Sequence, residues 1–179
     1  MLFTICILVL VVLVYTFLVN VKKLLELSDV KDFGHPLSKH LNISDVDLEK
    51  RVLDNIEKIK NTGKSAKWSE SVLKNNLNKI NASTKFHDRA TMEKAVRDAF
   101  ASPEGQKVLK NVKNLSKGMV KGKSFEQPFV VKNIGSDLGY GYKVIGGVSS
   151  KINKITDIEI FLKADGKGGF YISSAFPKL

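Results

Sequence analysis

The sequence predicts an α+β fold in which helices pack on an antiparallel sheet. Up to Gly118, apolar residues recur at helical spacing, and after it β-branched and aromatic residues alternate with polar ones between recurrent glycines. Once the first apolar stretch is set aside, the 179 residues leave enough chain for one modest core. We therefore expect a membrane or signal segment over residues 1–23 and a single domain over residues 24–179.

The chain begins with an uncharged apolar run over residues 2–21, long enough to cross a bilayer as a helix and followed by Lys22 and Lys23. We expect an uncleaved single-pass anchor, because no basic residue precedes the run and no small-residue cleavage site follows it. A secreted protein that has lost a signal peptide is the alternative. The one cysteine, Cys6, lies inside this run, so the predicted domain is free of disulfides.

Four helices are expected in the first part of the domain. The first begins at Ser44 or Asp45, both good N-caps, and ends at Gly63, with an apolar face of Val46, Leu53, Ile56 and Ile59. The second lies within residues 64–81, and a short extended piece through Phe86 follows it. Asp88 caps the third helix, and Ser102-Pro103 starts the fourth.

Strands are expected over residues 128–134, 140–148, 157–164 and 169–176. The last two are joined by DGKGG, whose glycines permit the positive φ angles that a tight hairpin requires. The order of elements predicts a meander of strands with helices on one face of the sheet.

The formal net charge is +11, and every charged side chain lies beyond the apolar run. Such a domain attracts polyanions, and RNA is one candidate partner. A solvated lysine-rich surface is the alternative, because the lysines are scattered rather than gathered in one dense block.

The segment HPLSKH brings His35, Lys39 and His40 within six residues, and Arg51 follows on the first predicted helix. Cleaving an RNA phosphodiester without a metal needs a base for the 2′-hydroxyl, an acid for the leaving 5′-oxygen and positive charge near the phosphorus. Histidine, lysine and arginine supply these roles near neutral pH. The alternative is a set of ordinary surface groups.

Near the C-terminus, the alternation of the last strand places Ser174 and Phe176 on one face. A hydroxyl beside an aromatic ring is able to hold a nucleobase, with Ser174 forming hydrogen bonds and Phe176 stacking. The alternative is that Phe176 packs into the core.

Four blocks, in one order, resemble the RNase A-like toxin domain of bacterial contact-dependent growth inhibition and other polymorphic toxins. They are GHPLSKHL (34–41), RV (51–52), NASTKFHDRATMEKAV (81–96) and FYISSAFP (170–177). The resemblance implies a disulfide-free RNase A-like fold and a metal-independent ribonuclease that uses no cofactor. It implies cleavage through a 2′,3′-cyclic phosphate, a role in interbacterial competition and a cognate immunity protein, which we expect to be acidic.

By position, the resemblance makes His40 and Arg51 catalytic, and Ser174 and Phe176 stand where the family usually has Thr and Tyr. We expect His35 to be a second acid or base and Lys39 to contact phosphate. Phenylalanine lacks the tyrosine hydroxyl, so either activity is reduced or Phe176 serves only for stacking. The main alternative is a catalytically degenerate, membrane-tethered module that binds RNA or protein; a further alternative is a basic domain that lies against anionic lipid.

Overall fold

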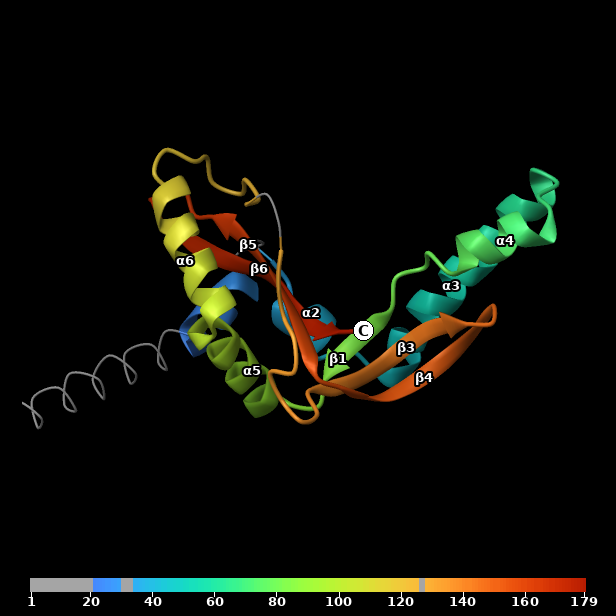
Figure 1. Cartoon of the computed structure of the whole chain (residues 1–179), viewed down its shortest axis with the longest axis horizontal. Coiled ribbons are helices and arrows are strands. Elements are labelled where there is room, and N and C mark those ends of the chain that lie inside the picture. The colour runs from blue at the N-terminus through green and yellow to red at the C-terminus, as the bar shows by residue number, and fades with distance from the viewer. Residues whose placement is uncertain (1–20, 30–33, 126–127) are drawn as a thin grey trace, which may run out of the picture.

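The computed structural model describes residues 21–29, 34–125 and 128–179. It confirms the α+β class, with helices packed around antiparallel strands (Figure 1). The apolar run over residues 2–21 lies outside the described residues, except for Val21, so the membrane anchor remains a prediction. Within the described ranges, no helix is both long and apolar enough to cross a membrane.

The labelled helices are α2 (Pro36–His40), α3 (Asp45–Ser65), α4 (Glu70–Leu77), α5 (Arg89–Ala101) and α6 (Pro103–Leu115), and residues 21–29 are also helical. The predicted caps are confirmed. The Ser44 hydroxyl accepts from the Asp47 amide, the Asp88 carboxylate from the Thr91 amide and the Ser102 hydroxyl from the Gly105 amide. Each cap satisfies an amide that the first turn leaves unpaired.

The strands form two antiparallel sheets of three strands each, whereas the sequence predicted one. One sheet has the order β2-β5-β6, from β2 (Phe129–Val131), β5 (Asp157–Ala164) and β6 (Phe170–Lys178). The other has the order β1-β3-β4, from β1 (Ser83–Phe86), β3 (Gly139–Ile145) and β4 (Val148–Ile155). The predicted strand over residues 140–148 is in fact β3 and the start of β4, because Gly146 and Gly147 turn the chain with positive φ.

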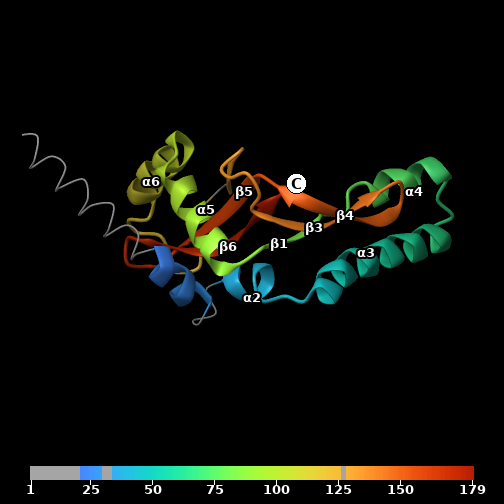
Figure 2. The ribbon, with the colours of Figure 1, turned by 90° about the horizontal axis from the view of Figure 1, so that it is seen from below.

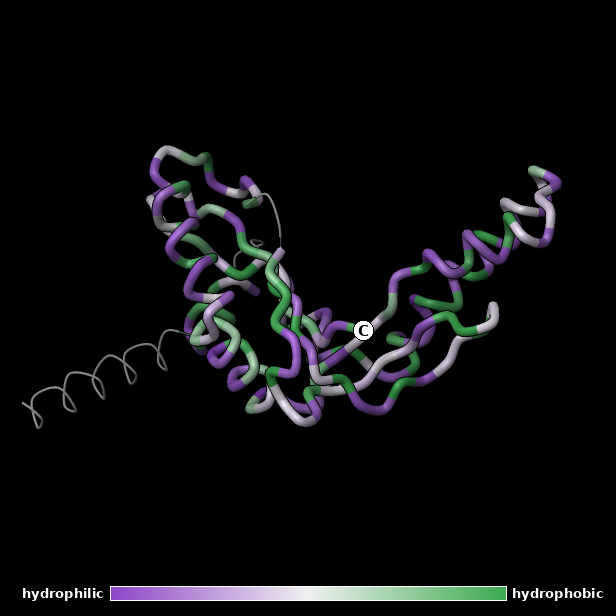
Figure 3. Tube along the Cα trace, in the orientation of Figure 1, coloured by the Kyte–Doolittle hydropathy of each residue, from purple (hydrophilic) through white to green (hydrophobic). Residues whose placement is uncertain are grey.

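The first lobe consists of the sheet β2-β5-β6 with residues 21–29, α5 and α6 packed against it. Figure 3 shows hydrophobic residues recurring along its strands, and all three residues of β2 are hydrophobic. Its core joins Phe100 and Met92 of α5 to Ile158, Ile160 and Ile172 of the sheet, each 1% exposed or less. The apolar face of α5 consists of Met92, Val96, Ala99 and Phe100, which are all buried.

The second lobe consists of the sheet β1-β3-β4 with α3 and α4, and the two lobes open into a V (Figure 1). The predicted apolar face of α3 is partly wrong: Val46 is 76% exposed and Leu53 46% exposed. The buried stripe instead follows the four-residue spacing of Leu48, Val52 and Ile56. Helix α3 also continues past Gly63, which lies against Trp68.

Candidate active site

The two lobes meet at a seam between β1 and β6. The hydroxyl of Thr84 in β1 donates to the carbonyl of Pro177 in β6 over 2.6 Å, and both groups are buried. Helix α2 contacts both strands, and Figure 2 shows it on the same side of the strands as α3. Side chains of α2 are therefore held against both sheets at once.

A bulge in β6 decides which side chains face the space between the lobes. Counting from the turn, Leu162 pairs with Ile172, but the next pair is Phe161 with Ser174 and not with Ser173. The extra residue moves Ala175 into the core and leaves Ser174 and Phe176 half-buried on the opposite face. The prediction that Ser174 and Phe176 share a face is confirmed, and the alternative that Phe176 packs in the core is wrong.

Gly34 allows the start of α2 to pack closely against this bulge. A Cβ atom at Gly34 would lie 2.5 Å from the Cα atom and the carbonyl oxygen of Ser173. Cβ atoms do not approach backbone atoms this closely, so only glycine fits here. The His35 amide then donates to the same Ser173 carbonyl over 3.1 Å. The absent side chain therefore sets how closely the start of α2 approaches β6.

His40, at the end of α2, lies at the seam. Its ring packs against Phe176 with 4.9 Å between the ring centroids, and its Nδ1 lies 3.2 Å from the carbonyl oxygen of Thr84. A carbonyl only accepts, so Nδ1 carries the hydrogen and donates it. In the neutral ring this leaves Nε2 with a free lone pair, and Nε2 makes no hydrogen bond within the described part of the chain.

Burial lowers the pKa of His40 from 6.5 to about 4. The positive charges of Arg51, His35 and Lys39 act in the same direction, whereas the hydrogen bond to Thr84 opposes them. His40 is therefore neutral near pH 7, the form in which imidazole accepts a proton.

Arg51 and Lys39 place positive charge beside His40. The Arg51 guanidinium donates through Nη1 to the Lys39 carbonyl over 3.1 Å, which ties α3 to the end of α2. Both side chains are exposed, so they are free to meet an anion from solvent. Arg51 is thus fixed near the ring by one donor and has further donors for a phosphate.

His35 and Ser174 line a small cavity of about 290 Å³ beside His40, together with Phe161, Phe176 and Lys163. Partial burial and the nearby Lys39 ammonium lower the pKa of His35, and Asp29 opposes them. All six predicted site residues thus lie in one neighbourhood, linked by the contacts of Phe176 with His40 and of Arg51 with Lys39.

A larger cavity of about 870 Å³ also borders the Phe176 ring. Phe161 and Phe176 line both cavities and stack on each other, with 5.9 Å between centroids and 26° between planes. Glu159 and Lys178 lie on the same wall, and Lys79 and Lys143 line the cavity as well. The two rings form an apolar strip between basic side chains, an arrangement suited to unpaired bases and their phosphates.

Sequence reasoning missed Phe161, Lys163 and Thr84 as neighbours of the site. Thr84 carries no local signal, because it reaches His40 only through the packing of β1 on α2. Phe161 and Lys163 alternate with the core residues of β5, so the pattern indicates that they face away from the core. The pairing of Phe161 with Ser174 depends on the bulge, for which the sequence carries no signal.

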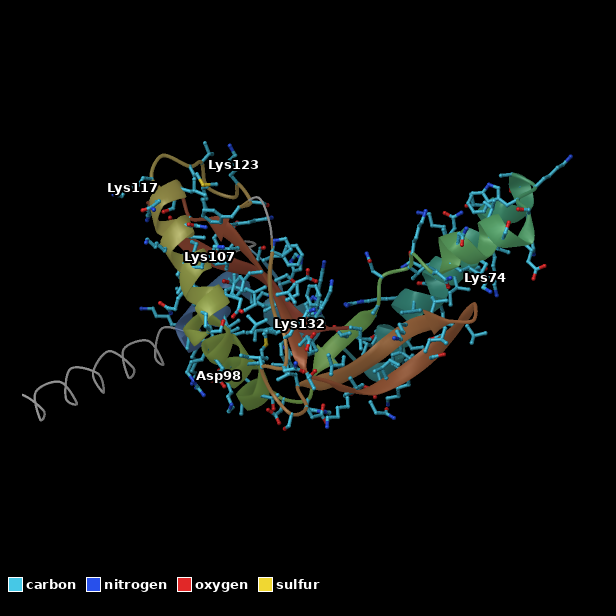
Figure 4. The ribbon with its side chains drawn as sticks, in the orientation of Figure 1. Lys74, Asp98, Lys107, Lys117, Lys123 and Lys132 are labelled. Carbon is cyan, nitrogen blue, oxygen red and sulfur yellow. The ribbon has the colours of Figure 1, made fainter. Side chains whose placement is uncertain are left out.

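Positive charge extends beyond the site over both lobes. Lys74 projects from α4 at the far end of the second lobe, while Lys107 and Lys117 lie on and just after α6 in the first (Figure 4). All three are exposed. Within the described ranges, no group of three or more His, Cys, Asp or Glu side chains comes together to hold a metal ion.

The chain was compared with protein-family models, curated proteins and solved structures. None of these comparisons gave a significant match.

Proposed function

We propose that this chain is a metal-independent ribonuclease of the RNase A-like toxin class. The observation that carries the proposal is the position of His40, which is neutral and donates through Nδ1 to Thr84, leaving Nε2 free. Arg51 supplies positive charge at the same place, and the Phe161–Phe176 strip lies alongside. A poised base, a cation and a stacking surface are what cleavage of an RNA chain requires.

In the proposed reaction, His40 Nε2 takes the proton of a ribose 2′-hydroxyl. The 2′-oxygen forms a bond to the adjacent phosphorus, and the bond from phosphorus to the 5′-oxygen breaks. His35 gives a proton to the leaving 5′-oxygen, and the product carries a 2′,3′-cyclic phosphate. Arg51 and Lys39 offset the negative charge that gathers on the phosphate oxygens in the transition state.

The bound phosphate also helps the proposed proton transfers. Arg51 and Lys39 lower the pKa values of the histidines in the free protein, so a negative phosphate between these cations reverses part of that effect. His35 is the more exposed of the two and lies beside Ser174. We therefore assign the base to His40 and the acid to His35.

The test is incubation of the full chain, purified in non-ionic detergent, with total RNA and EDTA. The wild type should cleave the RNA. The cleavage rate of His40→Ala should be about 10²- to 10⁴-fold lower, which is the usual contribution of a general base. His87→Ala is the matched control, because His87 pairs with Asp137 outside both cavities and its loss should leave cleavage intact. Cleavage retained by His40→Ala would refute the assignment.

The second candidate function is a degenerate module that binds RNA or protein without turnover. The observation that favours it is Phe176, which has no hydroxyl to offer where the resembled family has tyrosine. Binding of RNA with no product in EDTA would support this candidate, and Phe176→Tyr would then be the variant to assay. The membrane anchor, the acidic immunity protein and the role in competition are proposed together with the toxin.

A further inference from the structure

Glu159 is the one acidic side chain among the described residues that line the two cavities. Its side chain is 10% exposed, and Oε2 accepts from Lys178 Nζ over 2.7 Å. Oε1 makes no hydrogen bond within the described ranges, and it is not sealed away from solvent. Glu159 lines the larger cavity, and Oε1 is the carboxylate oxygen left to accept a further hydrogen bond there.

A carboxylate is unfavourable in a site that binds a polyanion, because it repels phosphate. The neutral part of RNA that it attracts is a base edge bearing N–H groups. The placement of Glu159 agrees with this role. In the register of β5 and β6 it lies directly opposite Phe176, so its side chain is the cross-strand neighbour of the proposed stacking ring.

We propose that Glu159 selects the base that stacks on Phe176, through a hydrogen bond accepted by Oε1. Adenine, cytosine and guanine each offer an amino group at the edge of the ring, whereas uracil offers only its N3–H, which lies between two carbonyl oxygens. Glu159 therefore accepts more favourably from the first three, because the uracil carbonyls repel the carboxylate. This selection rests on the proposed ribonuclease function, and it adds a preference that the catalytic residues do not supply.

The first experiment uses DNA oligonucleotides that contain a single ribonucleotide, so that only one linkage has the 2′-hydroxyl that cleavage needs. One set varies the base of the ribonucleotide, and a second set varies the base on its 3′ side. In one of the two sets, kcat/KM for the uracil member should be about tenfold lower than for the other three, the usual discrimination of one good contact. Equal rates across both sets would overturn the proposal.

The second experiment compares Glu159→Gln with Glu93→Gln. A glutamine amide both donates and accepts, so Glu159→Gln should bring the uracil substrate to within about threefold of the others. Glu93 forms its ion pair with Arg89 on α5, away from both cavities, and its variant should keep the wild-type ranking. If Glu159→Gln does not fold, Glu159→Asp, whose carboxylate is withdrawn by one methylene, should also weaken the discrimination. An unchanged ranking in a folded Glu159 variant would overturn the proposal.

A third experiment separates this inference from the reaction on which it rests. Fluorescent 2′-O-methyl oligonucleotides of the four bases bind without being cut, and their affinities are read by anisotropy. If the chain fails to cleave RNA, the ribonuclease is refuted, but base selection would still be supported if wild type binds the uracil oligonucleotide more weakly than the other three and Glu159→Gln removes that difference. Equal affinity for all four would overturn it.

Discussion

The two lobes differ in the size of their buried apolar clusters. In the first lobe, α5 and α6 cover the sheet, and Phe100, Met92 and Ile172 are almost inaccessible. In the second, the buried cluster is smaller, and Val72, Ile145 and Val148 are at least 40% exposed at the end far from the seam. We therefore expect the first lobe to be the more stable of the two and the second to depend on its attachment to the first.

This difference bears on the site, because the site draws on both lobes. Phe176 and Ser174 stand on the well-packed sheet, whereas Arg51 extends from α3 of the less buried lobe. The proposed nucleobase site is therefore held by the well-packed lobe. The position of the Arg51 guanidinium depends on the less buried lobe. Local opening is expected first where few apolar contacts are buried.

The largest expected effect is in the first lobe. Phe100 is 1% exposed and contacts the rings of Phe129 and Phe170. Phe100→Ala should lower the free energy of unfolding by about 3–5 kcal/mol, because it leaves a cavity between helix and sheet. Urea unfolding of the full chain, followed by far-UV circular dichroism, measures this. A loss below about 1 kcal/mol would mean that this lobe is not the more stable one.

Acid should weaken the seam between the lobes. The pKa of His40 is about 4 in the folded chain and near 6.5 when unfolded, so the unfolded state takes up the proton first. The contribution is nil above about pH 6.5, and stability is lost as the pH falls toward 4, by about 2–4 kcal/mol in total. Urea unfolding at several pH values should show this fall, and His40→Gln should show less of it. Equal slopes in the two proteins would contradict the burial of His40.

The core of the second lobe should give a smaller effect. Ile56 of α3 is 6% exposed, but its cluster is completed by half-buried residues such as Ile59 and Leu73. Ile56→Ala should cost about 2 kcal/mol, the lower end for such a truncation. Trp68 is the one tryptophan of the chain and contacts Gly63 of α3, so its fluorescence reports on this lobe. An unfolding midpoint by fluorescence equal to that by circular dichroism would mean that the lobes unfold together.

The smallest effect is expected at a residue that the sequence pattern placed in the core. Leu53 is 46% exposed on α3. Leu53→Ala should change the free energy of unfolding by no more than about 0.5 kcal/mol, as at most surface sites. The same urea titration measures it, and a cost near that of Ile56→Ala would show that the outer face of α3 is covered in solution.

The sequence predicted best those elements whose signals are local. Asp88 and Ser102 cap helices through neighbouring amides, and DGKGG turns the chain by its own glycines. Helix α2 was missed because His35 precedes it without a side-chain cap and it has only five residues. Strand β4 was missed because VSSKINKI is largely polar, and its form comes from pairing with β3. Elements whose conformation depends on a partner elsewhere in the chain have no distinctive pattern in their own residues.

The site shows the same division. The six predicted residues came from residue type and from the resemblance, and the structure brings them together. Their geometry was not predictable, since the tautomer of His40 depends on a carbonyl 44 residues away. Glu159 and Phe161 were missed because their alternation with core isoleucine and leucine is equally typical of an ordinary solvent-facing strand.

The bulge at Ser173 holds one spare residue of β6, so the effect of shortening this strand depends on which residue is lost. Ser173 makes one side-chain hydrogen bond, to the Phe161 carbonyl over 3.3 Å, so replacing its side chain is a mild change. Deleting Ser173 would remove the bulge and keep Phe176 opposite Glu159, because Ser173 is the residue that the pairing skips. Closing the bulge with Ser173 kept would instead put Phe176 opposite Ile158 and exchange it with Ala175 between cavity and core. A library of single-codon deletions across β6 should therefore tolerate the loss of Ser173 better than the loss of Ala175, which would put Ser174 or Phe176 opposite Ile160 and into the core.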